Sequence, residues 1–238
     1  MKLCVIPARG GSKRIPRKNI RMFAGRPMLA HSIQAARASG LFDRIVVSTD
    51  DEQIAAVAEA HGAEIPFLRP RALADDYTGT DAVVRHAIAW FQADGQPVSH
   101  TCCVYATAPF LRAGDIRAGY EKLIASGKSF VFAATRYVFP IQRSIRLNER
   151  GEVEALFPEH LFSRSQDLPP AYHDAGQFYW GTAQAYLDEE VIFSPASLIV
   201  ELPHYRVRDI DTEDDWEEAE LMYRLLQDRE NRRTGEQP

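Results

Sequence analysis

The chain has 238 residues, of which 45% are hydrophobic, enough for a substantial core, and its net charge of -5 makes it acidic. An acidic chain is atypical of general nucleic-acid-binding proteins, which favour basic surfaces, and no apolar stretch reaches the roughly 20 residues that a membrane helix needs. Cys4, Cys102 and Cys103 lie in apolar segments without a Cys-x-x-Cys spacing. This pattern is typical of buried, reduced thiols in a cytoplasmic protein, so we expect no nucleic-acid or membrane partner.

The first predicted element is a buried strand over Lys2–Ile6, and the loop after it is rich in glycine and positive charge. Gly10 and Gly11 let the backbone approach an anion closely. The cations of this loop would repel one another in an exposed flexible turn, so we predict that the loop binds phosphates. It matches neither the Walker A pattern nor Gly-x-Gly-x-x-Gly, which argues against a Rossmann dinucleotide site. The cations are Arg9, Lys13, Arg14, Arg17 and Lys18.

Strand and helix patterns alternate along the first half of the chain. Pro27 opens a helix that Gly40 ends, and Thr49 with Glu52 resembles a capping box for a helix to about His61. The alternation predicts an α/β fold with a mostly parallel, Rossmann-like sheet flanked by helices, in which ligands bind beyond the carboxyl ends of the strands. The other predicted strands are Arg44–Ser48, Glu64–Leu68, His100–Tyr105 and Phe130–Thr135, and the other predicted helices are Asp81–Ala93 and Gly114–Ser126.

The alternation ends after Thr135. Two short strand patterns, Ser144–Asn148 and Val153–Leu156, flank a turn and predict a β-hairpin. The segment 139–170 is therefore expected to be an insertion of the kind that forms a lid or a dimer arm, and Gly176–Gly181 a strand that returns to the sheet. We expect a single domain over 1–230, with this arm inserted in it, and a disordered tail over 231–238.

Two carboxylates, Asp209 and Asp211, precede the last predicted helix, which Thr212 and Asp215 are expected to cap. Alternation around Ile210 puts both carboxylates on one side of an extended segment. Such a pair suits Mg²⁺, which takes few carboxylates together with substrate phosphates. An alternative of equal weight is that Asp211 or Thr212 merely caps the helix. The apolar stripe of that helix consists of Trp216, Ala219, Tyr223 and Leu226.

Two further segments mix groups that bind polar ligands. The loop Asp75–Asp81, which follows Arg69, suits a ribose or a base, although capping of the next helix is the more economical explanation. The segment Tyr172–Gly181 suits either a small polar-ligand pocket or a half-buried strand. His173 with Asp174 hints at a general base, but the chain has no Gly-x-Ser-x-Gly turn, so a hydrolase triad is not expected.

Taken together, these motifs resemble the CMP-sialic acid synthetase family of cytidylyltransferases, from Leu3 to about Tyr223. The resemblance implies a nucleotide-diphosphosugar-transferase (GT-A-like) fold and a homodimer whose inserted arms complete each other's sugar sites. It also implies transfer of CMP from CTP to the anomeric hydroxyl of a nine-carbon keto-sugar acid (a nonulosonic acid), with Mg²⁺ or Mn²⁺ as cofactor. The segments that carry the resemblance are Ala8–Asn19, Arg44–Asp50, Arg69–Pro70, Leu73–Ala74, Thr78–Thr80 and Asp209–Thr212.

The resemblance also implies roles for individual residues. Arg9 and Lys18 are expected to stabilise the α-phosphoryl group and the leaving pyrophosphate, and Asp211 joins them as catalytic because it shares the metal with Asp209. Phe193 is expected to reach the partner's sugar pocket. The expected nucleotide-binding residues are Ala8, Arg9, Gly10, Gly11, Ser12, Lys13, Arg14, Lys18, Asn19, Arg69 and Thr80. The expected sugar-binding residues are Ala106, Arg164, His173, Gln177, Tyr179 and Phe193.

Departures from the sialic acid enzymes indicate the substrate. Ala106 stands where those enzymes have a glutamine that faces the sugar, Ser165 where they have an arginine, and Ala175 where they have an asparagine, while Gln177 replaces a small residue. The loss of polar contacts from a buried site changes which sugar hydroxyls it accepts. The run 174–181 resembles the pseudaminic acid branch, so we predict pseudaminic acid as the substrate. The alternatives are N-acetylneuraminic, legionaminic or 3-deoxy-manno-octulosonic acid and, in a different class, a catalytically inactive nucleotide-binding module.

Overall fold

The computed structural model describes residues 1–75 and 77–234. Within these residues, a central sheet has six strands in the order β10, β6, β9, β5, β1, β4. β9 runs antiparallel to its two neighbours and the other pairs are parallel, which confirms the predicted mostly parallel sheet. The strands are β1 (Lys2–Pro7), β4 (Arg44–Ser48), β5 (His100–Val104), β6 (Phe130–Arg136), β9 (Tyr172–Thr182) and β10 (Ser197–Glu201).

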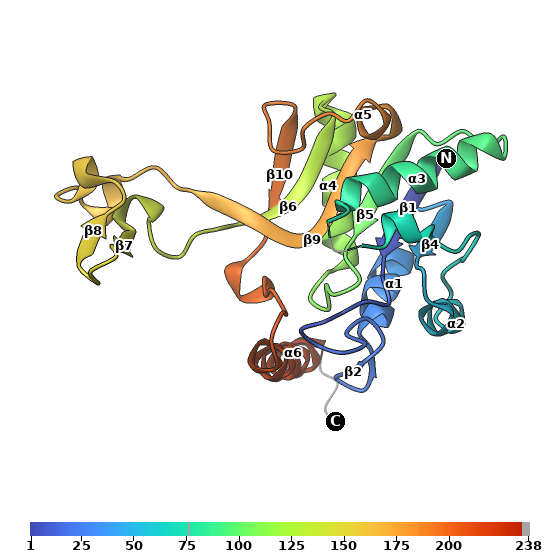
Figure 1. Cartoon of the computed structure of the whole chain (residues 1–238), viewed down its shortest axis with the longest axis horizontal. Helices are drawn as coiled ribbons and strands as arrows, with labels where there is room; N and C mark the ends of the chain where they lie inside the picture. Colours follow the sequence, from blue (N-terminus) through green and yellow to red (C-terminus); the bar gives the residue numbers. More distant parts are fainter. Residues whose placement is uncertain (76, 235–238) are drawn as a thin grey trace.

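Helices cover both faces of the sheet, as predicted (Figure 1). α1, α2 and α4 bury apolar side chains such as Ile33 and Ile116 against one face, whereas α3 and α5 pack Phe91 and Tyr186 against the other. α1 stops where predicted because Gly40 adopts a φ of 67° and donates its N–H to the Arg37 carbonyl. The helices are α1 (Met28–Ser39), α2 (Glu52–Ala60), α3 (Thr80–Ala93), α4 (Ala113–Ser126), α5 (Ala183–Leu187) and α6 (Glu213–Thr234).

A third cluster of buried residues joins the loop after β1 to α6. The cluster contains Ile15 and Phe23 from the N-terminal part of the chain, where β2 (Met22–Phe23) pairs with β3 (Arg26–Pro27), and Trp216 from α6. The predicted apolar stripe of α6 packs in this cluster. The C-terminal helix therefore supports the glycine-rich loop, although the two are far apart in the sequence.

The insertion between β6 and β9 leaves the body of the molecule as an arm (Figure 1). β7 (Ile145–Leu147) and β8 (Val153–Ala155) form the predicted antiparallel hairpin at its far end. Apolar side chains on the arm face solvent in this single chain: Phe162 is 98% exposed and Leu147 67% exposed. Exposed apolar surface of this kind is typical of an interaction site, and a two-stranded hairpin alone is marginally stable.

Four sequence predictions need correction. The cap of α2 is Asp51, whose carboxylate accepts from Gln53 N and Ile54 N, and not Thr49. The Thr49 hydroxyl accepts from Asp51 N instead. The segment Glu64–Leu68 forms only a single bridge, between Glu64 and Val46.

The other two corrections concern the C-terminal third of the chain. α6 continues through Thr234, beyond the predicted end of the domain at 230, and the rest of the predicted tail, 235–238, lies outside the described residues. The sequence patterns also did not reveal α5 and β10. The three cysteines are buried free thiols, as predicted, and no helix in 1–75 or 77–234 is long and apolar enough to cross a membrane.

Candidate active site

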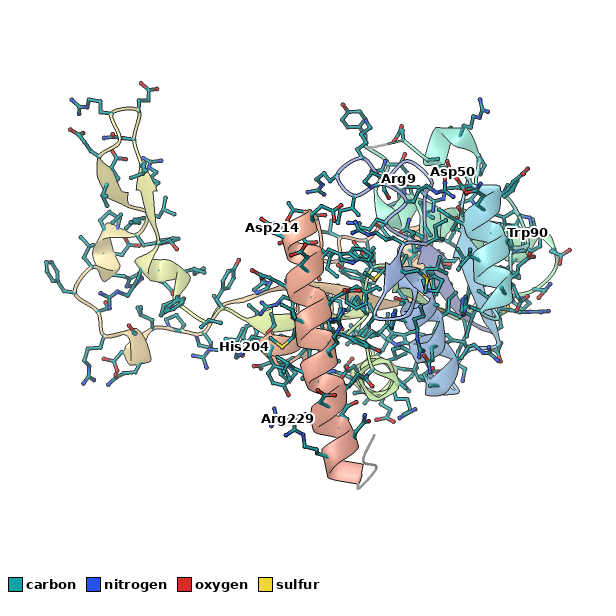
Figure 2. The ribbon with its side chains drawn as sticks, turned by 90° about the horizontal axis from the view of Figure 1, so that it is seen from below. Arg9, Asp50, Trp90, His204, Asp214 and Arg229 are labelled. Carbon is teal, nitrogen blue, oxygen red and sulfur yellow. The ribbon has the colours of Figure 1, made fainter. Side chains whose placement is uncertain are left out.

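A cleft of about 290 Å³ lies at the carboxyl ends of β1 and β5, where the sheet topology predicts a ligand. Most of its charged lining is basic, so it suits a polyanion. Figure 2 shows Arg9 on the loop after β1 and Asp50 on the loop after β4 at the same end of the molecule. The lining includes eight of the predicted nucleotide-binding residues, namely Arg9, Ser12, Lys13, Arg14, Lys18, Asn19, Arg69 and Thr80, together with Tyr105, Ala106 and Thr107.

The glycine-rich loop is fixed by the end of β4. Gly10 N donates to Asp50 Oδ1 over 2.9 Å, and a Cβ on Gly10 would come within 2.9 Å of Asp51 Oδ2, so only glycine fits there. Arg17 has a φ of 56°, which is uncommon for a residue with a side chain. Its guanidinium pairs with Asp51 at 2.5 Å, which compensates for that conformation and lowers the pKa of the carboxyl group. Asn19, almost fully buried, donates to the Arg9 carbonyl.

The loop meets the acidic segment through Lys18. Its ammonium donates to the Ile210 carbonyl at 2.6 Å and to Asp211 Oδ1 at 3.2 Å. The other oxygen of Asp211 pairs with Arg14 at 2.6 Å. Asp209 is exposed and the Ile210 side chain is buried, which fits the predicted alternation. The structure thus brings together two motifs that lie nearly the whole chain apart.

The geometry confirms the alternative that Thr212 caps the last helix, whereas the metal role of Asp209 and Asp211 stays a prediction. Thr212 and Asp215 form the cap of α6: Asp215 Oδ2 accepts from Thr212 N, and Thr212 Oγ1 accepts from Asp215 N. Asp215 Oδ2 also accepts from Asp211 N. The Asp211 carboxylate therefore takes no part in capping and instead faces the cations of the loop.

Arg69 supplies a buried positive charge to the cleft. Its guanidinium donates to the Ser48 hydroxyl and carbonyl and to the Leu73 carbonyl. Burial lowers its pKa from the ordinary value, with the neighbouring Arg9 acting in the same direction, but arginine remains charged at neutral pH. The hydrogen-bond acceptors of Arg69 are neutral oxygens, and the nearby Asp50 carboxylate acts in the opposite direction and raises its pKa. The fixed positive charge favours an incoming anion.

A second cavity, of about 390 Å³, adjoins the cleft, and Thr80 and Tyr105 line both. Tyr179 and Phe193, two of the predicted sugar-binding residues, line this second cavity with Asp174. Phe193 also contacts Phe132 edge-on, with ring centroids 5.2 Å apart, and so packs within its own chain. The Phe193 side chain is also 66% exposed, and its expected reach into a partner's sugar pocket stays a prediction. Ala106 lines the nucleotide cleft instead.

The other predicted sugar-binding residues are not brought together within one chain. Gln177 is 3% exposed and donates to the Arg206 carbonyl at 2.7 Å, so it lines neither cavity and is no sugar contact in this structure. His173 packs against Tyr137 at the root of the arm. Arg164 lies on the arm and pairs with Asp167.

Sequence reasoning missed Tyr105, which separates the two cavities, and gave Asp174 only a passing role. The available signal was the position of Tyr105 as the last residue of a predicted strand, at the end where ligand contacts gather. Asp174 lies before a glycine with a φ of 59°, Gly176, whose N–H donates to the Asp174 carboxylate. No pattern in the sequence announces such a turn inside a strand.

Comparison with known proteins agrees with this geometry. A family model described as cytidylyltransferase matches residues 3–227. Pseudaminic acid cytidylyltransferase from Campylobacter jejuni is 51% identical over 94% of this chain and 96% of its own length. CMP-N,N'-diacetyllegionaminic acid synthase from Legionella pneumophila is 36% identical, over 95% of this chain and 97% of its own.

Solved structures show the same fold. CMP:2-keto-3-deoxy-manno-octonic acid synthetase in complex with CTP superposes with a TM-score of 0.67 at 15% identity, covering 94% of this chain and 99% of that one. 4-diphosphocytidyl-2C-methyl-D-erythritol synthase from Anaerococcus prevotii gives a TM-score of 0.61 at 14% identity, covering 95% and 98%. The chain belongs to the cytidylyltransferase family, in the branch that contains the pseudaminic acid cytidylyltransferases.

Proposed function

We propose that this enzyme transfers CMP from CTP to the anomeric hydroxyl of pseudaminic acid, giving CMP-pseudaminic acid and pyrophosphate. The observation that carries the proposal is the basic cleft, which Lys18 ties to the Asp209–Asp211 segment and which opens beside a second cavity. The identity of 51% to a relative named for this activity, over nearly all of both chains, supports the choice of sugar.

The cations of the cleft would bind the triphosphate. Negative charge develops on the α-phosphoryl oxygens and on the pyrophosphate as it leaves, and fixed cations stabilise that charge without reorganising. Lys18 is held by two acceptors, so its ammonium is already oriented before CTP arrives. Arg69 is immobilised by burial, whereas the side chain of Arg14 is 69% exposed and is able to swing from Asp211 to a phosphate.

Asp209 and Asp211 are proposed to hold Mg²⁺. The described residues contain no group of three or more acidic, histidine or cysteine side chains that could bind a metal by themselves. A pair of carboxylates that leaves the remaining positions to phosphates and water fits Mg²⁺ better than a complete protein cage. When bound, the ion would neutralise phosphate charge and lower the pKa of the attacking hydroxyl.

The reaction itself is an in-line displacement. The anomeric oxygen forms a bond to the α-phosphorus, the bond from that phosphorus to the bridging oxygen of pyrophosphate breaks, and the hydroxyl proton leaves to water or a base. Tyr105 and Tyr179 are unsuited as that base, because burial raises the pKa of both phenols. They remain protonated and act as hydrogen-bond donors.

The active form is proposed to be a homodimer. Sugar-binding candidates on the arm, such as Arg164, lie away from the second cavity of their own chain, and the arm exposes large apolar side chains. A second copy would cover these side chains and bring Arg164 to a sugar site.

The experiment that tests the reaction uses pseudaminic acid labelled with ¹⁸O at the anomeric hydroxyl. Incubation with CTP and Mg²⁺ is followed by mass spectrometry of the products. We expect the label in CMP-pseudaminic acid, at the oxygen that bridges sugar and phosphorus. Loss of more label than the free sugar exchanges with water over the same time would mean that the sugar carbon is attacked. Recovery of unreacted CTP with every sugar acid would support an inactive nucleotide-binding module.

A further inference from the structure

The second cavity differs in charge from the nucleotide cleft beside it. Its carboxylates come from Asp81, Asp174, Glu189 and Glu190, and Arg85 is the single basic side chain among the described residues that line it. Arg85 already pairs with Asp81 at 3.0 Å and with Glu189 at 3.6 Å. The cavity therefore keeps a negative balance, although the neighbouring cleft is strongly positive.

Asp174 is the carboxylate that the fold fixes most firmly in this cavity. Its Oδ1 accepts from Gly176 N at 2.9 Å, and its Oδ2 accepts from the Tyr179 hydroxyl. An ionised carboxylate has about four lone-pair positions and donates nothing. Two positions are filled by the protein, so those that remain are available to water or to a donor on a ligand.

Another part of the lining is apolar. Val84, Val191, Ile192 and Phe193 contribute to it, and Phe193 is braced edge-on by Phe132. A cavity with a fixed acceptor near an apolar surface matches a group in which an N–H lies close to a methyl. An N-acetyl group on a sugar has this form, whereas a carboxylate would meet only repulsion.

We propose that Asp174 determines sugar specificity by accepting a hydrogen bond from an amide N–H of an N-acylamino substituent. The same charge keeps the carboxylate of the sugar acid out of this cavity and directs it towards the cationic side of the site. Tyr105 and Thr80, which line both cavities, then mark where the anomeric centre meets CTP. This assignment rests on the proposed function, because it presumes that the second cavity holds the sugar.

The test compares Asp174→Asn with Glu189→Gln, a matched neutralisation of a carboxylate on the rim of the same cavity. We measure pyrophosphate release and expect Asp174→Asn to raise KM for pseudaminic acid about tenfold or more, the usual effect of losing a charge-assisted hydrogen bond. KM for CTP should change less than about twofold, since CTP occupies the other cavity. Glu189→Gln should raise KM for pseudaminic acid much less than Asp174→Asn does, because the Glu189 side chain is 69% exposed and already pairs with Arg85.

A substrate analogue separates specificity from a structural role. In the analogue, one acetamido group is hydrolysed to an ammonium, which pairs with a carboxylate more strongly than an amide does. Asp174→Asn should therefore raise KM for the analogue more than KM for pseudaminic acid. Equal changes for both sugars, an equal rise in KM for CTP, or an equal effect of Glu189→Gln would overturn the proposal.

A binding measurement keeps this test independent of the proposed function. Calorimetric titration of each sugar into the full chain with a non-hydrolysable CTP analogue compares the same variants without turnover. If the wild type uses N-acetylneuraminic acid instead, the proposed substrate is wrong, but Asp174→Asn should still weaken binding of that N-acylamino sugar. If Asp174→Asn does not fold, Tyr179→Phe, which removes the donor that orients Asp174, should weaken sugar binding in the same direction, and unchanged binding would contradict the proposal.

Discussion

Lys18 contacts more of the proposed machinery than any other single side chain described above. Its ammonium holds the Ile210 carbonyl and Asp211 while lining the cleft, so one residue links the phosphate loop to the acidic segment. A sequence pattern placed Lys18 among the phosphate ligands because basic loops after a strand bind anions. The pattern could not reveal the contact with Asp211, since that contact depends on how α6 packs.

Substitution of Lys18 by methionine keeps the length of the side chain and removes its charge. We expect kcat to fall about a hundredfold or more, as when one fixed donor to a developing charge is removed. Pyrophosphate release at saturating substrates measures the effect. Lys122→Met is the matched control, because Lys122 is an exposed lysine of α4 whose ammonium also donates to a backbone carbonyl, that of Ile199 in β10. A comparable loss of kcat in this variant would refute a specific role for Lys18.

The metal proposal predicts a particular defect for Asp209→Asn. The Mg²⁺ concentration at half-maximal activity should rise about tenfold or more, since substitution even of residues that only hydrogen-bond to metal ligands weakens metal binding by that amount. Electron paramagnetic resonance of Mn²⁺ with CTP and enzyme gives a second readout, in which the variant should bind less metal. Asp214→Asn, an exposed carboxylate on the first turn of α6, is the control, and equal effects of the two variants would rule out Asp209 as a ligand.

At the scale of elements, the sequence predicted most helix and strand positions because local patterns set them. β1, α1, α3 and α4 follow hydrophobic patterns bounded by glycine or proline, β4 follows an apolar run, and α6 begins at the expected Thr212–Asp215 cap. The N-cap of α2 is Asp51 and not Thr49, because the Asp51 carboxylate accepts hydrogen bonds from two backbone amides of the first turn and Thr49 accepts from neither. The short β10 and α5 pack on β6 and α3, so their positions depend on tertiary contacts.

The Asp51 cap gives a pH-dependent contribution to stability. The pKa of Asp51 is lowered in the folded protein by the hydrogen bond from Arg17, so its contribution is complete above the ordinary carboxyl range, near pH 4, and is lost as the pH falls below it. Asp51→Ala should lower the free energy of unfolding by about 1–2 kcal/mol at pH 7. Urea denaturation at pH 7 and pH 3 should show a smaller difference at the lower pH.

Glu59→Ala, on the exposed face of the same helix, is the control for this measurement. It should change stability little at either pH, since alanine is a good helix former. A loss for Asp51→Ala that stays the same between pH 7 and pH 3 would show that the charge of Asp51 does not contribute.

The structure gives Gln177 a different role from the one that the resemblance implies. The residue was expected to bind sugar, but its amide donates to the Arg206 carbonyl, and Arg206 in turn pairs with Asp115 at 2.6 Å. This link joins β9 to the segment that leads to Asp209. Gln177 therefore helps to hold that segment in position. Its side chain is buried, which the sequence alone does not show.

Gln177→Leu should leave the buried Arg206 carbonyl without its donor and lower the free energy of unfolding by about 1–3 kcal/mol. KM for the sugar should change much less than kcat. Urea denaturation and steady-state kinetics measure the two effects, and Gln184→Leu, an exposed glutamine on α5, should be nearly neutral. A large increase in sugar KM without loss of stability would restore the original interpretation as a sugar contact.

At the scale of the whole molecule, the arm is the feature that a single chain does not explain. The sequence predicted its limits and its hairpin because the α/β rhythm stops at Thr135 and turn residues follow. Its apolar side chains are exposed in one chain, so neither a sequence pattern nor the fold of one copy identifies a partner for them. The nucleotide cleft, in contrast, is lined by many of the predicted nucleotide-binding residues within one chain.

The proposed homodimer predicts that polar residues on the hairpin prevent association. Leu147 and Val153 are paired across the hairpin, and both are more than half exposed. The double substitution Leu147→Asp with Val153→Asp should give monomers by sedimentation velocity and should reduce turnover with sugar more than affinity for CTP. Arg150→Ala, at the tip of the hairpin, should remain dimeric, and a wild type that sediments as a monomer would contradict the proposal.

The proposed reaction requires that the two adjoining cavities are a CTP site and a pseudaminic acid site. The most direct test is pyrophosphate release with CTP and Mg²⁺, comparing kcat/KM for pseudaminic acid and N-acetylneuraminic acid. We predict a preference for pseudaminic acid of at least about a hundredfold. A preference for N-acetylneuraminic acid would contradict the assignment of the sugar, and no release with either acid would contradict the assignment of the reaction.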